Sequence, residues 1–113
     1  MAENLVHITK ENFEEEVKNS EVPVILDFWA EWCAPCMMLG PIFEALAPSY
    51  SGKIKFAKVN TEEVQEIAQQ FAIQGIPSLV VMNKGVEADR FVGAMPEPIL
   101  KQKIDEVLEK LSE

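Results

Sequence analysis

The sequence predicts an α/β fold, a mixed central sheet with helices on both faces, in the order β-α-β-α-β-α-β-β-α. Two patterns indicate it. Strand and helix patterns alternate through the first two-thirds of the chain, as parallel strands with helical crossovers require. The last two strand patterns follow each other across a short turn, which adds an antiparallel edge. The chain has 113 residues, 48% of them apolar and 26% charged, so we expect one globular domain over residues 1–113.

The N-terminal third predicts a strand, a helix and a second strand. Residues 6–8 have the pattern of a short strand. Thr9 can cap a helix over about residues 11–18, where apolar side chains recur four positions apart. Residues 22–29 are apolar on both faces, as expected of a central strand that is covered on either side.

The middle third predicts two helices with a strand between them. A helical pattern follows a Cys-x-x-Cys motif until a Ser-Gly pair ends it, and we expect a kink at Pro41. The strand is expected at residues 54–59. Asn60 or Thr61 then caps a helix over residues 62–71.

The C-terminal third predicts a β-hairpin and a last helix. The hairpin strands are expected at residues 78–82 and 88–92, joined by Asn83-Lys84-Gly85. A helix is expected over about residues 97–111. Two prolines suit its first turn, where the missing N–H groups do no harm.

The charge balance makes nucleic acids and membrane surfaces poor partners. Nineteen acidic residues outnumber ten basic ones, which gives a formal charge of −9. Such a surface repels phosphate backbones and anionic lipids, although acidity also simply keeps a protein in solution. No apolar run approaches the ~18 residues that span a bilayer, and the N-terminus lacks the pattern of a secretory signal. We therefore expect a cytoplasmic protein.

The two cysteines, Cys33 and Cys36, form the Cys-x-x-Cys motif where a buried strand ends and a helix begins. In the first helical turn, Cys33 would face free backbone N–H groups and the positive end of the helix dipole, which favour thiolate over thiol. Cα atoms three positions apart in a helix are ~5 Å apart, within the range that a disulfide needs. We expect Cys33 to attack a substrate disulfide and Cys36 to resolve the mixed disulfide.

Two other interpretations of the cysteine pair stay open. A metal site needs two more ligands, and the other candidate, His7, lies on a different strand, so we expect neither a metal nor another cofactor. An inert structural disulfide would close a loop too short to constrain the unfolded chain much.

Asp27 stands in the middle of an apolar strand, where a carboxylate is costly unless it is paired or protonated. One interpretation is a polar residue at a sheet edge. The other is a buried acid of raised pKa that exchanges a proton with Cys36 through water as the disulfide opens. Lys58, on the next strand, is a candidate charge partner, although a lone lysine is more often solvated.

Three apolar residues are candidates for an exposed docking patch. Trp32, Ile76 and Met95 would form it if the fold brought their loops to one sheet edge; otherwise each is ordinary core. The Ile76-Pro77 bond precedes a strand and carries the ~5–6% chance of a cis bond that any X-Pro bond has.

Taken in order, these segments resemble the thioredoxin family over nearly the whole chain. The resemblance rests on Asp27-Phe28-Trp29-Ala30-Glu31-Trp32-Cys33-Ala34-Pro35-Cys36, then Pro41, Gly75-Ile76-Pro77-Ser78, Asn83-Lys84-Gly85 and Gly93. It implies the thioredoxin fold, with strand order 1-3-2-4-5 and two helices on each face. It also implies an oxidoreductase that reduces disulfides of target proteins and is re-reduced by a thioredoxin reductase. We expect it to act as a monomer.

The resemblance also assigns roles by position. Cys33 resembles the nucleophile and Cys36 the resolving thiol. Asp27 matches the family's buried acid and Lys58 its lysine neighbour. Pro77 matches a cis-proline whose preceding residue pairs by backbone hydrogen bonds with an extended substrate. The expected substrate-binding residues are Trp32, Ala34, Pro35, Gly75, Ile76, Pro77, Gly93 and Ala94.

Three departures from the family bear on partner choice more than on activity. Ala34-Pro35 replaces the usual Gly-Pro, without the histidine of oxidising relatives. Met37 replaces a lysine or arginine, and the lost cation should raise the pKa of Cys33 slightly. Residues 95–98 start the last helix without the usual cap, which would stiffen the substrate-side loop.

Two other functions compete with a disulfide reductase. A binding or holdase module of the same fold would need none of Cys33, Cys36 and Asp27, so their joint presence argues against it. An oxidase or isomerase is disfavoured because there is no secretory signal and no histidine between the cysteines.

Overall fold

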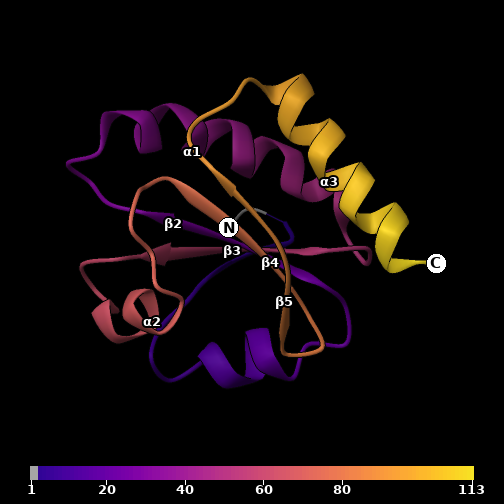
Figure 1. Cartoon of the computed structure of the whole chain (residues 1–113), viewed down its shortest axis with the longest axis horizontal. Coiled ribbons are helices and arrows are strands. Elements are labelled where there is room, and N and C mark those ends of the chain that lie inside the picture. Colours follow the sequence, from indigo (N-terminus) through magenta and orange to yellow (C-terminus); the bar gives the residue numbers. More distant parts are fainter. Residues whose placement is uncertain (1–2) are drawn as a thin grey trace.

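A five-stranded sheet lies at the centre of the computed structural model, which describes residues 3–113 (Figure 1). Taken from one edge of the sheet to the other, the strands are β1 (Leu5–His7), β3 (Lys55–Asn60), β2 (Val24–Trp29), β4 (Ser78–Asn83) and β5 (Val86–Val92). β3 pairs in parallel with β1 and β2, whereas β4 pairs antiparallel with β2 and β5. The mixed sheet and its order of strands and helices are as predicted.

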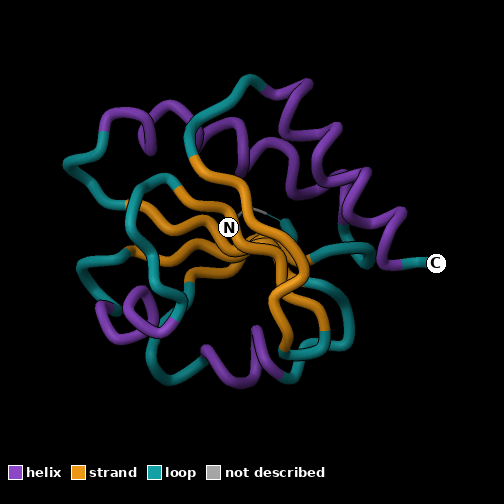
Figure 2. Tube along the Cα trace, viewed as in Figure 1, coloured by secondary structure: helices purple, strands orange, loops and turns teal. Residues whose placement is uncertain are grey.

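Helices cover both faces of this sheet (Figure 2). One face carries α1 (Ala34–Leu46), which continues as the 3₁₀ turn η2 (Ala47–Tyr50), and α3 (Glu97–Leu111). The other face carries the short π-helical segment η1 (Glu14–Lys18) and α2 (Gln65–Gln70). Among the residues described, no helix is both long and apolar enough to cross a bilayer.

The first helix is shorter than predicted because Thr9 and Asn12 close a turn ahead of it. The Asn12 N–H donates to Thr9 Oγ1 at 3.1 Å, and the Thr9 N–H donates to Asn12 Oδ1 at 2.7 Å. The helical segment η1 therefore begins only at Glu14. Similarly, Asn60 Oδ1 accepts the Glu62 N–H at 2.9 Å, so Asn60 caps a turn that precedes α2 rather than α2 itself.

The hairpin turn is one residue tighter than predicted. Lys84 and Gly85 have φ values of 53° and 80°, and two consecutive left-handed residues make the two-residue turn that suits a twisted hairpin. β5 therefore starts at Val86, two residues earlier than expected. β2 starts after Pro23, because proline has no N–H to donate to a hydrogen bond with a neighbouring strand.

Alternate residues of β2 face opposite sides of the sheet, and this sets the side on which Asp27 lies. Leu26 and Phe28 pack with the core under η1 and α2, whereas Ile25 packs with the core under α1 and α3. Because side chains alternate along a strand, Asp27 faces the α1 side together with Ile25. β2 then ends at Trp29, directly before the loop that leads into α1.

Candidate active site

Cys33 and Cys36 form a disulfide at the N-terminus of α1. Their Cα atoms are 5.2 Å apart, close to the separation expected from helix geometry. Cys33 is the residue before the helix rather than part of its first turn, and its Sγ accepts the Cys36 backbone N–H at 3.3 Å. A Cys33 thiolate in this position would therefore be stabilised by a backbone N–H and by the helix dipole.

Both cysteines are buried. Cys33 is 5% exposed and Cys36 is 2% exposed, so both lie beneath the surface when they are joined. Ala34 and Pro35, between them, are exposed. Cys33 Sγ lies 3.7 Å from the carbonyl oxygen of Ile76, so the loop before β4 contacts the sulfur.

Asp27 is a buried acid and not a residue at a sheet edge. It is 1% exposed on β2, which is flanked by β3 and β4. Among residues 3–113, neither of its carboxylate oxygens has a hydrogen-bond partner. Burial raises the pKa of Asp27 to about 7, against the opposing pull of the Lys58 cation. Asp27 can therefore both bind and release a proton near neutral pH.

Lys58 is next to Asp27 but forms its ion pair with another residue. The β2–β3 register sets Lys58 opposite Asp27, and Lys58 is 8% exposed, so it is not the solvated lysine that was the alternative. Its Nζ donates to Glu44 Oε2 at 2.8 Å and lies 4.8 Å from the centre of the Trp29 ring. Sequence analysis missed Glu44, although it is the one charged residue in α1.

The expected substrate-binding residues lie at one end of the sheet, on three loops and in the first turn of α1. The Ile76-Pro77 peptide bond is cis, and the Gly93 N–H donates to the Pro77 carbonyl at 2.8 Å. This hydrogen bond connects the loop after β5 to the loop before β4, and the loop before β4 also contacts Cys33. Gly75 and Ala94 are exposed on these two loops.

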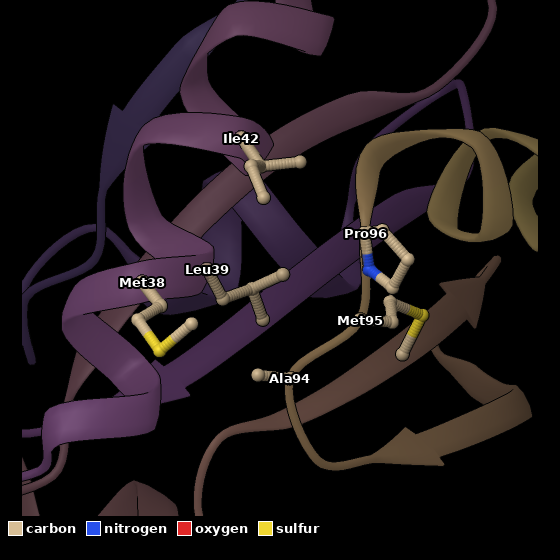
Figure 3. A pocket seen from close by; sticks show the side chains of 6 residues that line it. All are labelled: Met38, Leu39, Ile42, Ala94, Met95 and Pro96. Carbon is tan, nitrogen blue, oxygen red and sulfur yellow. The ribbon is translucent and has the colours of Figure 1, made fainter.

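The predicted apolar patch is divided between two hollows. Trp32 is 69% exposed, its Nε1 donates to Glu62 Oε2 at 3.1 Å, and it lines a hollow of about 180 Å³ with Ile76. Met95 instead lines a larger hollow of about 340 Å³ (Figure 3). One wall of that hollow comes from α1 and the other from the loop before α3; its lining is Met38, Leu39, Ile42, Ala94, Met95 and Pro96. Sequence analysis missed the α1 wall.

No grouping of three or more His, Cys, Asp or Glu side chains suited to a metal ion occurs within residues 3–113. His7, the one candidate outside the cysteine pair, lies on β1, which β3 separates from β2.

Known proteins are similar to this chain over most of its length. The family model described as Thioredoxin matches residues 4–106. "Thioredoxin 1" of Nostoc sp. is 44% identical over 101 residues, which are 89% of this chain and 94% of that protein. "Thioredoxin" of Chlorobaculum thiosulfatiphilum is 46% identical over 98 residues, 87% of this chain and 91% of that protein. "Thioredoxin M-type, chloroplastic" of Pisum sativum is 39% identical over 89% of this chain and 59% of that protein.

Proposed function

The chain belongs to the thioredoxin family of thiol–disulfide oxidoreductases, and we propose that it reduces disulfides of target proteins through Cys33 and Cys36. The observation that carries the proposal is the Cys33–Cys36 disulfide at the N-terminus of α1, together with a buried acid of pKa about 7 on β2, the strand that leads into the cysteine loop. A binding module without turnover would need neither feature, and the named relatives favour the enzyme.

The reaction needs two sulfur exchanges. The Cys33 thiolate attacks one sulfur of the target disulfide, which forms a Cys33–target bond and releases the other target sulfur as a thiolate. Cys36 then attacks Cys33 Sγ, which forms the Cys33–Cys36 disulfide and releases the second target thiolate. The target gains two electrons and the cysteine pair loses two. Asp27 takes the proton of the Cys36 thiol as that thiol attacks, because its raised pKa makes it an adequate base.

The target would bind across the loops around Cys33. The exposed Trp32 and the half-buried Ile76 offer apolar contact on one side of the sulfur. The backbone of Ile76, next to the cis-proline, would pair with an extended target segment. Ala34, Pro35, Gly75, Gly93 and Ala94 complete the surface by leaving the backbone accessible.

A donor must return the two electrons after each cycle. We propose a thioredoxin reductase-type protein as this donor and a range of disulfide-containing proteins as targets, with the chain acting as a monomer in the cytoplasm. The reaction starts from a reduced cysteine pair. This supports a reducing compartment such as the cytoplasm, where enzymes keep thiols reduced.

Two single variants test the assignment of the sulfurs. Cys36→Ser is expected to accumulate a covalent adduct with targets, because the mixed disulfide forms but is not resolved. Cys33→Ser is expected to form no adduct and to lose turnover. Non-reducing gels of a target mixture with each variant, with and without a reductant, show the adduct. Equal inertness of both variants, or adducts with Cys33→Ser alone, would contradict the roles.

A further inference from the structure

We propose that Glu44 is a positioning residue for this reaction: it holds the Lys58 ammonium against α1 and so leaves Asp27 free to exchange protons. The proposal rests on the proposed role of Asp27 as the base for Cys36. It concerns a residue that lies on a different helix turn from the cysteines and has no contact with them among those described.

The β2–β3 register would by itself favour a pair between Asp27 and Lys58. The two residues are Cα partners in adjacent parallel strands, which lie ~4.8 Å apart, and their side chains share the face under α1. A buried ammonium and a buried carboxylate at this spacing would normally form an ion pair. In the structure they do not form one.

Contacts from α1 and β2 draw the ammonium elsewhere. Lys58 Nζ donates to Glu44 Oε2 at 2.8 Å and lies over the Trp29 ring at 4.8 Å. A Cβ atom added at Gly40 would lie 3.5 Å from Nζ, so the ammonium rests directly against the helix backbone. The Glu44 side chain is 42% exposed, so the pair reaches from the buried site to the solvent.

The charges around Asp27 act in opposite directions. Lys58 on β3 lowers the pKa of the Asp27 carboxyl, whereas Glu44 on α1 raises it. Asp27 pairs across β4 with Leu79, which carries no charge. Cys33 and Cys36, at the start of α1, do not titrate while they are joined. Removing the Glu44 charge would lower the pKa of Asp27 twice over, since it removes a like charge and releases the lysine.

A purely structural ion pair would have a different signature. An ion pair that is partly open to solvent adds little to stability. If Glu44 acted on Asp27 through its own charge alone, its removal would lower the Asp27 midpoint equally with and without Lys58. The titration of Asp27 therefore separates the two roles better than stability does.

The test follows the Asp27 carboxyl directly, by ¹³C NMR of protein labelled at aspartate, across pH 4 to 9. The chain has three aspartates, and Asp27→Asn identifies the signal of interest. The disulfide form is used because its cysteines do not titrate. In Glu44→Gln the midpoint is expected to fall by about one pH unit or more. Glu44→Asp should largely restore it, and Glu109→Gln, on the exposed face of α3, should leave it unchanged.

An unchanged or raised Asp27 midpoint in Glu44→Gln would overturn the proposal. An equal downward shift of the Asp27 midpoint when Glu44→Gln is made in a Lys58→Met background would also overturn it, because Glu44 would then act without the lysine. The pH profile of target reduction separates this inference from the proposed function. Suppose that Glu44→Gln lowers the Asp27 midpoint, but that neither Glu44→Gln nor Asp27→Asn moves the pH profile of target reduction. The base role of Asp27 then fails, whereas the positioning of Lys58 by Glu44 stands.

Discussion

At the residue scale, the chemistry that we propose uses a carboxyl that the fold buries without a hydrogen-bond partner among the residues described. Asp27 is buried on a central strand without a protein hydrogen bond among the residues described, and its pKa is raised to about 7. Such a group destabilises the fold when ionised. The base role that we propose for Asp27 would account for its burial, because a proton acceptor for Cys36 needs a pKa near neutral.

Replacing Asp27 with Asn is expected to stabilise the protein in a pH-dependent way. In the unfolded chain this carboxyl loses its proton near pH ~3.9, whereas in the folded chain it keeps it up to about pH 7. The stability of the wild-type chain should therefore fall as pH rises between these values. The advantage of Asp27→Asn should be small at pH 4 and grow to roughly 2–4 kcal/mol at pH 8.

Urea unfolding of both proteins at several pH values measures this difference. The same variant should slow target reduction most at and above neutral pH, where the carboxylate is the form that accepts the proton. A stability difference that is constant with pH would show that Asp27 titrates normally in the folded chain.

Sequence analysis could identify Asp27 because its anomaly is local: a carboxylate in an apolar strand. The partner of Lys58 was harder to find, since the contact joins β3 to α1 over 14 positions of sequence. A lone glutamate on a helix is ordinarily a solvated residue, and only the packing of α1 on the sheet brings Glu44 onto the lysine. The signal was the absence of any other charge in that helix.

At the element scale, α1 carries the site and contains two residues that weaken isolated helices. Pro41 removes one backbone hydrogen-bond donor and Gly40 adds conformational freedom. The helix forms nonetheless because its buried side packs Leu39, Phe43 and Leu46 against the sheet. Tertiary packing, rather than propensity, therefore places Cys33 and Cys36.

Gly40→Ala is expected to stabilise the protein by about 0.5–1 kcal/mol, because alanine lowers the cost of ordering a helix interior. The added Cβ would meet Lys58 Nζ at 3.5 Å, an ordinary contact. Gly85→Ala is the matched contrast: Gly85 has a φ of 80°, so the substitution should destabilise by about 1 kcal/mol. Urea midpoints of the two variants should lie on opposite sides of the wild-type value. A destabilised Gly40→Ala would show that the ammonium needs the space.

The element boundaries that were predicted well from the sequence are those set by prolines and by the pattern of apolar residues. The last helix begins and ends where its prolines and apolar stripe predict, at Glu97 and Leu111. The boundaries that were missed are set by side-chain caps and turn geometry, as at Thr9, Asn60 and Lys84. Thr9 and Asn60 bond to backbone N–H groups nearby, and Lys84 adopts a left-handed turn conformation. Hydrophobic periodicity contains no signal for such local features.

At the scale of the whole molecule, the site is assembled from parts that are distant in sequence. The cysteines precede α1, the Ile76 carbonyl comes from the loop before β4, and Gly93 follows β5. The strand order brings these loops to one end of the sheet. Sequence analysis predicted this convergence through the fold that the family resemblance implied, whereas the two hollows beside the cysteines depend on side-chain packing and were not predicted.

The net charge should influence which targets react fastest. The chain carries a formal charge of −9, and Glu31, Glu62 and Glu63 line a hollow next to Trp32. A disulfide peptide flanked by lysines should therefore be reduced several-fold more slowly in ~200 mM salt than in ~20 mM salt, because salt screens the attraction. A peptide flanked by glutamates should respond in the opposite direction. Stopped-flow rates with the two peptides measure the effect, and identical salt responses would show that charge does not steer targets here.

The reduction potential of the Cys33–Cys36 couple tests the central claim most directly. The protein is equilibrated with glutathione buffers of known ratio, quenched with a thiol alkylator, and its dithiol fraction is measured. Thioredoxins have reduction potentials of about −270 mV. For a two-electron couple ~30 mV corresponds to ~1.4 kcal/mol, so a disulfide reductant is clearly distinguished from an oxidase or isomerase. We expect a value close to −270 mV, that of a reductant of protein disulfides. A value of about −180 mV or higher would contradict that role and indicate an oxidase or isomerase.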